Sequence, residues 1–183
     1  MYISAQRIDL AQRAKWNIGF WVAGFIFWAY AAAIGSIYPI MSARSYWLIG
    51  ACFIGPVAMI ASYFLSADPK ARGNSLAQLV GMAHVSVLVI SLPLIFEAYL
   101  YFPDALILVM AICFGIDFFV MCWAYAAPFH AVHAVVRTSL VSLIWFARPE
   151  WRSVILPSVV ALCYLITVAY IIIERPKWLD THQ

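Results

Sequence analysis

Six long apolar segments occupy most of this 183-residue chain, and they constrain its fold more than any other feature. A helix that crosses a bilayer needs about 20 consecutive apolar residues. Hydrophobic residues make up 66% of the chain and charged residues 10%, whereas soluble domains have roughly 45–50% and 25%. The sequence therefore predicts an all-α, polytopic membrane helix bundle, with one transmembrane domain over residues 1–183.

Prolines and short polar runs mark the breaks between these segments. The longest polar run covers residues 67–74, and Asn74 or Ser75 in this region is a suitable amino-terminal cap for the helix that follows. Residues 3–14 mix apolar and polar side chains, which predicts a short interfacial helix before the first span. The predicted spans are residues 16–39, 46–66, 77–101, 104–126, 128–147 and 152–173.

Basic residues are unequally divided between the two sides that six spans define. Both termini and the 67–76 loop fall on one side, which then holds seven basic residues against three on the other. Because basic residues favour the cytoplasmic side, we expect both termini to be cytoplasmic, in a bacterial inner membrane. The first group is Arg7, Arg13, Lys15, Lys70, Arg72, Arg175 and Lys177, and the second is Arg44, Arg148 and Arg152.

Ionisable residues inside three neighbouring spans are the main sign of chemistry. Such residues cost about 2.5–3.5 kcal/mol each on insertion scales, so they normally face the bundle interior and find partners. His84, Asp117, His133 and Arg137 lie about 8–13 Å from the cytoplasmic ends of their spans, at 1.5 Å per residue. His130 joins them, because its spacing from His133 and Arg137 places all three on one helix face.

Two interpretations of this polar cluster stay open. Asp117 is the expected counter-ion of Arg137, and such a pair can simply fix the packing of neighbouring helices. Alternatively, Asp117 and His133 bind protons, ions or a small solute while His84 lines their path, since histidine titrates near neutral pH. The first interpretation suits a non-transporting subunit or assembly protein with a membrane-protein partner, and the second suits a carrier or channel.

Cofactor chemistry has weaker support in the sequence. His84 with His133 or His130 would supply two haem ligands, but the sequence contains no haem attachment motif, and a nearby arginine disfavours a bare cation. We therefore expect no metal and no cofactor, with a haem-binding redox subunit as the third alternative. The sequence also lacks phosphate-loop, GxSxG and HExxH motifs, so we expect no enzymatic activity.

Basic residues in loops and tails indicate contact with the bilayer surface and not with nucleic acid. Prolines inside the spans predict helix kinks, most clearly at Pro93 and also at Pro56 and Pro157. Small residues allow helices to approach closely in membranes. We expect close approach at Gly35, Gly50, Gly55, Gly81 and Gly115.

Three segments carry a resemblance to a known family. They are residues 72–82, which read Arg-Gly-Asn-Ser-Leu and continue to Leu-Val-Gly-Met, residues 115–125, with Gly-Ile-Asp-Phe before Trp-Ala-Tyr, and residues 20–28, from Phe-Trp to Phe-Trp. The chain resembles a bacterial family of small six-span membrane proteins known only as a domain of unknown function. The resemblance implies the same topology and assigns no activity.

Overall fold

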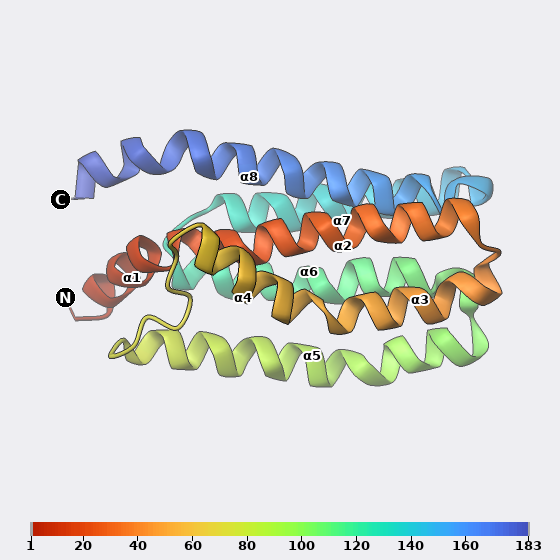
Figure 1. Ribbon diagram of the computed structural model, residues 1–183, viewed down its shortest axis with the longest axis horizontal. Helices are drawn as coiled ribbons and strands as arrows, with labels where there is room; N and C mark the ends of the chain where they lie inside the picture. Colours follow the sequence, from red (N-terminus) through yellow and green to blue (C-terminus); the bar gives the residue numbers. More distant parts are fainter. Residues whose placement is uncertain (1, 183) are drawn as a thin grey trace.

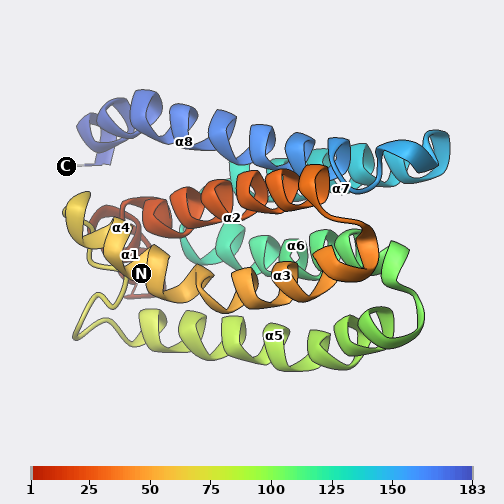
Figure 2. The ribbon, with the colours of Figure 1, turned by 45° about the vertical axis from the view of Figure 1, so that its right-hand side comes forward.

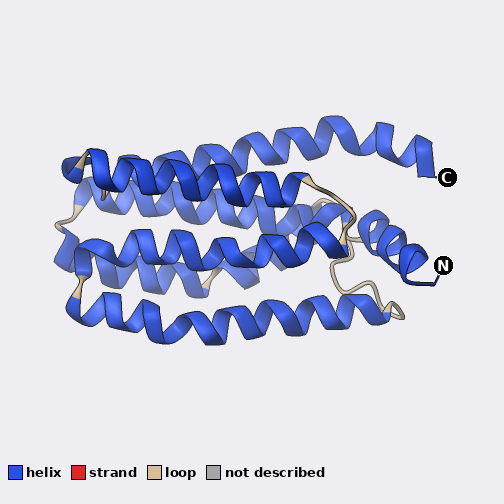
Figure 3. Cartoon of the chain, turned by 180° about the vertical axis from the view of Figure 1, so that it is seen from behind, coloured by secondary structure: helices blue, strands red, loops and turns tan. Residues whose placement is uncertain are grey.

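Long helices run side by side in a computed structural model that describes residues 2–182 (Figure 1). Short turns join the helices, and helix is the main structure of the described chain (Figure 3). Both chain ends lie at the same end of the bundle (Figure 1). The helices are α1 (Tyr2–Arg13), α2 (Ile18–Ile37), α3 (Ile40–Cys52), α4 (Ile54–Phe64), α5 (Ser75–Tyr101), α6 (Leu106–Ala124), α7 (Phe129–Ala147) and α8 (Ile155–His182), with short 3₁₀ turns at Lys15–Asn17, Pro103–Ala105 and Pro149–Trp151.

Five of the helical segments are long and apolar enough to cross a membrane, and the α3–α4 pair adds a sixth if it is counted as one bent span. This confirms the predicted all-helical membrane bundle and the helix before the first span. The helix bounds differ most from the predicted spans at α3, which already begins at Ile40, and at α8, which continues to His182. Which end of the bundle faces the cytoplasm stays a prediction.

The second predicted span is divided into α3 and α4, which meet at an angle of 44°. Pro56 explains the break, because it has no amide hydrogen to donate to the carbonyl of Cys52 one turn earlier. Helix α5, in contrast, continues through Pro93 to Tyr101 without interruption. Pro157 falls in the first turn of α8, where a helix loses no internal hydrogen bond.

Helix α2 lies between α8 on one side and the α3–α4 pair on the other, and α6 and α7 complete the bundle (Figure 2). Trp21, Trp28 and Trp47 are the largest fully buried side chains. The Trp47 indole donates a hydrogen bond to the carbonyl of Ala31 at 2.9 Å, which joins α3 to α2. Helix α5 is the most peripheral span and packs mainly along α6.

Side-chain contacts hold α5 at both of its ends. At the terminal end of the bundle, Asn74 caps α5 by accepting from the Leu76 amide at 3.0 Å, as predicted, and its side-chain amide donates to Asp9 of α1 at 2.7 Å. At the other end, the Arg44 guanidinium of α3 donates to the carbonyl of Tyr99 at 2.6 Å. Between these two ends, α5 packs mainly against α6.

The loop between α4 and α5 is anchored by an ion pair. Nη2 of Arg13, at the end of α1, lies 2.6 Å from Oδ2 of Asp68. The Arg13 hydrogen bond lowers the pKa of Asp68, against the opposing effect of burial and with help from the Ala71 amide. Helix α1 is thereby tied to the loop that leads into α5.

A left-handed turn connects α1 to α2. Lys15, Trp16 and Asn17 have φ angles of 50°, 52° and 62°, a region that costs non-glycine residues about 1–2 kcal/mol each. Tertiary contacts stabilise it, because Lys15 donates to the carbonyl of Leu65 at 2.7 Å and Trp21 donates to that of Trp16 at 3.1 Å. The direction of α1 is therefore set by packing and not by local propensity.

Glycines mark close approach at some of the predicted positions and not at others. A Cβ at Gly35 would overlap the carbonyl oxygen of Ser153, and one at Gly50 would lie 2.5 Å from the ring of Tyr30. Cβ atoms at Gly55 and Gly81 would meet no atom within 4 Å. The prediction of close helix approach is therefore wrong for Gly55 and Gly81.

Candidate functional site

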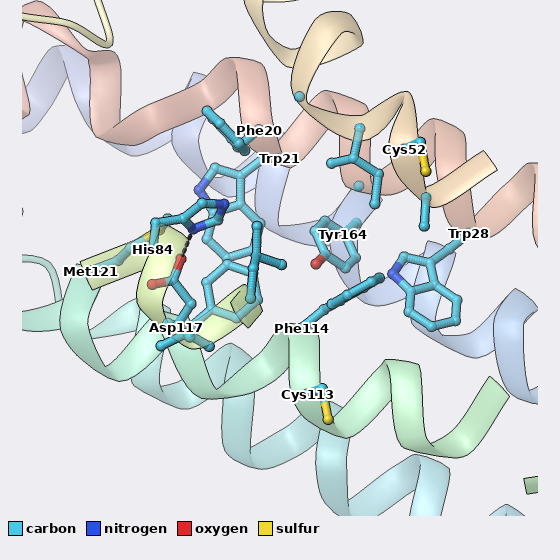
Figure 4. A pocket seen from close by; sticks show the side chains of 17 residues that line it. Phe20, Trp21, Trp28, Cys52, His84, Cys113, Phe114, Asp117, Met121 and Tyr164 are labelled. Carbon is cyan, nitrogen blue, oxygen red and sulfur yellow. Dashed lines mark hydrogen bonds and ion pairs between the residues drawn. The ribbon is translucent and has the colours of Figure 1, made fainter. Parts of the chain in front are cut away.

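A cavity of about 380 Å³ lies between the α3–α4 pair, α2, α5 and α6, and is called here the α4–α5 cleft (Figure 4). Its walls are largely aromatic, because α2, α6 and α8 each turn ring side chains toward it. The size falls within the range of small-molecule sites, which are usually about 300–1,000 Å³. The aromatic lining residues are Phe20, Trp21, Trp28, Phe114, Phe118 and Tyr164.

A hydrogen-bonded pair of His84 of α5 and Asp117 of α6, which is an ion pair when the imidazole is protonated, forms the polar part of this wall (Figure 4). Nδ1 of His84 contacts Oδ2 of Asp117, and the ring of Phe20 packs edge-on against the imidazole at 5.3 Å. Asp117 is only 5% exposed, and its Oδ1 atom has no hydrogen-bond partner within the described residues. The carboxylate is therefore half-satisfied and buried at the edge of the cleft.

Arg137 does not pair with Asp117, the partner that its depth in the membrane suggested. None of the ion pairs in residues 2–182 joins it to Asp117. Its Nη2 donates to the carbonyl of Ala111 at 2.8 Å, and its Nη1 donates to the hydroxyl of Tyr164 at 3.1 Å. The predicted Asp117–Arg137 pair is wrong, because the nearer imidazole of His84 pairs with the carboxylate.

Gly115 makes room for the Arg137 guanidinium. A Cβ at this position would overlap Nη2 of Arg137 and lie 3.2 Å from its Cζ. The guanidinium is fully buried and lies over the rings of Phe118 and Tyr164, 5.3 and 5.7 Å from their centroids. Arg137 thus joins α6, α7 and α8 through a carbonyl, a hydroxyl and two rings.

His133 is bound to α8 and not to the cleft. Its Nδ1 lies 2.8 Å from Oγ1 of Thr167, and the Thr167 hydroxyl donates its single proton to the carbonyl of Cys163 at 2.9 Å. His133 therefore donates from Nδ1, which leaves the lone pair of the neutral ring on Nε2. Trp21 and Phe118 cover this ring, with centroids 4.7 and 5.0 Å away.

His130 is fully buried, with its Nδ1 3.0 Å from the carbonyl of Ala127. Of the five residues predicted from the sequence, the structure brings only His84 and Asp117 together at the cleft. His130, His133 and Arg137 do share one face of α7, as their spacing predicted, and all are buried.

Two partners of the cluster, Tyr164 and Thr167, were missed by the sequence reasoning. Both lie in the sixth predicted span, and their hydroxyl groups were the available signal, since buried hydroxyls usually find hydrogen-bond partners. The aromatic lining of the cleft was also missed, because rings are common throughout the chain and carry no such signal.

The cleft reaches the molecular surface between α4 and α5. Cys52 and Leu88 line it from opposite sides, and both are exposed. Gly55 also lines it and has open space in place of a Cβ contact. The opening therefore lies on an apolar flank of the bundle and not at its polar end.

Clusters of three or more His, Cys, Asp or Glu side chains that could hold a metal are not found in residues 2–182. The two histidines that the haem hypothesis needs have different surroundings. His84 pairs with a carboxylate, and His133 is covered by rings.

Comparison with known proteins identifies the family of the chain. A family model described as a family of unknown function (DUF7010) matches residues 3–174, so the chain belongs to this family. No curated protein and no solved structure matches it significantly.

Proposed function

Since the family has no assigned activity, we propose from the site alone that the protein is a small six-span membrane carrier, in which protons bind at His84 and Asp117. The observation that carries this proposal is the ion pair in the wall of the α4–α5 cleft. Ionisable residues at membrane depth are expensive and typically mark substrate or proton pathways. A pair that borders an apolar cavity is placed to exchange protons with whatever occupies it.

The way α5 is held supports a moving part at this site. Contacts at Asn74 and Tyr99 fix its ends, and the His84–Asp117 pair is the polar link between its middle and α6. Breaking one partner of a buried ion pair is strongly unfavourable in low dielectric. Neutralising Asp117 or occupying the cleft would therefore change how α5 packs on α6.

Arg137 has a packing role in this proposal. Its hydrogen bonds and ring contacts join three helices, and it does not line the cleft.

Proton flux in proteoliposomes tests the proposal. We expect Asp117→Asn to reduce protein-dependent proton flux to the level of empty liposomes, because an amide cannot take up the proton. Glu97→Gln is the matched control, since it removes an exposed carboxylate from α5 about 20 Å along the helix from His84. Unchanged flux in Asp117→Asn together with reduced thermal stability would refute the carrier and favour a non-transporting subunit whose polar cluster only fixes helix packing.

We also propose the bacterial inner membrane as the location, with both termini cytoplasmic. In a variant without native cysteines, Glu150→Cys should react with an impermeant maleimide added to intact cells. Ala5→Cys should react only after the membrane is permeabilised. Both positions are exposed in the structure, so the reverse pattern would mean the opposite orientation.

We propose that the histidines act without haem. The rings of Trp21 and Phe118 lie against His133 and occupy space that a porphyrin would need. A Soret band in the absorption spectrum of the purified protein would contradict this proposal.

A further inference from the structure

We propose that the cleft binds a lipophilic organic cation, an ammonium group attached to an apolar tail, that enters sideways between α4 and α5. This rests on the proposed carrier function and names the class of solute it would move. The inference depends on the free oxygen of Asp117, the aromatic walls and the position of the opening.

Asp117 offers a ligand one unused acceptor. His84 contacts Oδ2, while Oδ1 has no hydrogen-bond partner in the described chain and almost no accessible surface, so a ligand in the cleft reaches it only when neighbouring side chains shift. An ionised carboxylate only accepts hydrogen bonds, so it favours a donor, and a charged donor most of all. An ammonium group satisfies this oxygen, and when the imidazole of His84 is neutral it also balances the charge of the carboxylate.

The aromatic walls suit the same group. Phe20 and Trp21 line the cleft near the His84–Asp117 pair, and Phe114 and Trp28 line it farther from the carboxylate (Figure 4). The negative face of an aromatic ring attracts a cation, and more strongly when the cation is desolvated. Apart from the His84–Asp117 pair and the aromatic rings, the lining consists of glycine, aliphatic and sulfur-containing residues, which suits an apolar tail.

When His84 is neutral, the negative charge of Asp117 also favours a cation over an anion in the cleft. A carboxylate ligand would lie beside the like charge of Asp117. Arg137 does not compensate for this, because it lies behind the rings of Phe118 and Tyr164 and donates to Ala111 and Tyr164. The other groups that interact electrostatically with Asp117 are Tyr125, His130 and Tyr164.

The position of the opening determines the route by which a ligand enters the cleft. Cys52 and Leu88 are exposed where they border the cleft, on a flank formed by apolar side chains of α4 and α5. Gly55 keeps the opening free of side-chain atoms. A solute with an apolar tail would therefore reach Asp117 from among the lipid chains.

Three probes with the same tail test the charge preference. Phenylbutylamine, phenylbutanol and phenylbutanoate place an ammonium, a hydroxyl and a carboxylate on one phenylbutyl group. Binding is measured by equilibrium dialysis of the detergent-purified protein at pH 7, with protein-free micelles as the blank. We expect the amine to bind about tenfold more tightly than the alcohol, equivalent to about 1.4 kcal/mol, and the carboxylate to bind most weakly.

Three variants locate the preference and the binding site. Asp117→Asn should bind amine and alcohol about equally, whereas Glu97→Gln should keep the wild-type order. Gly55→Leu should weaken binding of all three probes, because it adds a large side chain to the lining of the cleft at a position where a Cβ meets no atom within 4 Å.

Equal or tighter binding of the carboxylate by the wild-type protein would overturn the inference, and this comparison needs no variant. An amine preference that survives in a folded Asp117→Asn protein would also overturn it. Neither result refutes the carrier proposal, which the proton-flux assay tests separately. Amine binding without protein-dependent flux would instead support this site and refute the carrier.

Discussion

Gly115→Ala should destabilise the protein strongly although it adds a single methyl group. The new Cβ would overlap Nη2 of Arg137 and lie 3.2 Å from Cζ and 3.7 Å from Nε. The guanidinium is fully buried, so it must move against packed neighbours. Overpacking of this kind costs about 1–3 kcal/mol.

Movement of the guanidinium also weakens its hydrogen bonds to Ala111 and Tyr164. Hydrogen bonds to charged groups contribute about 1.5–3 kcal/mol each. Alanine gains about 1 kcal/mol over glycine in helix propensity, which offsets part of the loss. The net expectation is a decrease of about 2–4 kcal/mol in the free energy of unfolding, from these ranges together.

Gly81→Ala is the control, because its Cβ would meet no atom within 4 Å. It makes the same chemical change in a helix and should keep or slightly raise stability. Both variants are measured by thermal unfolding in detergent and by titration with a denaturing detergent. A double-mutant cycle with Arg137→Ala should remove most of the Gly115→Ala effect. Equal stability of the two glycine variants would refute the close contact between Gly115 and Arg137.

Three further changes test other contacts. Asn74→Ala should lower the free energy of unfolding by about 1–2 kcal/mol, because it removes the cap of α5 and the bond to Asp9; a thermal shift no larger than that of an exposed alanine variant would contradict this. Asp68→Asn should cost only about 0.5 kcal/mol at pH 7, because the pair with Arg13 is solvent-screened. Since the folded pKa of Asp68 is lowered, this difference should persist above about pH 4 and disappear as the pH falls through the folded value, as denaturant titrations at several pH values would show. Trp47→Phe should cost about 1–3 kcal/mol by leaving a buried gap and removing the indole bond to α2; an unchanged melting temperature would refute that role.

The spans were predictable because a bilayer requires long apolar segments, and hydropathy measures this requirement directly. The cap at Asn74 was predictable for a similar reason, since it depends on neighbours in the sequence. The bend between α3 and α4 was only partly predictable. Pro56 indicates a lost hydrogen bond, but the angle depends on how α4 packs against α2.

The partners of the buried polar residues could not be predicted from depth alone. Depth places Asp117, His84 and Arg137 at one level, but it does not give the rotation of each helix about its axis. Packing turns Asp117 toward α5 and turns Arg137 toward Gly115 and Tyr164. The sequence thus identified the residues of the cluster and assigned the wrong pair.

The sideways opening of the cleft changes which concentration governs its occupancy. A ligand that enters from the acyl chains equilibrates with the protein at its concentration in the lipid. Each added methylene contributes about 0.8 kcal/mol to partitioning, so it raises that concentration about fourfold before any contact with Asp117. Within a homologous series, the dissociation constant expressed in aqueous units should therefore fall with tail length even when the contacts inside the cleft are identical.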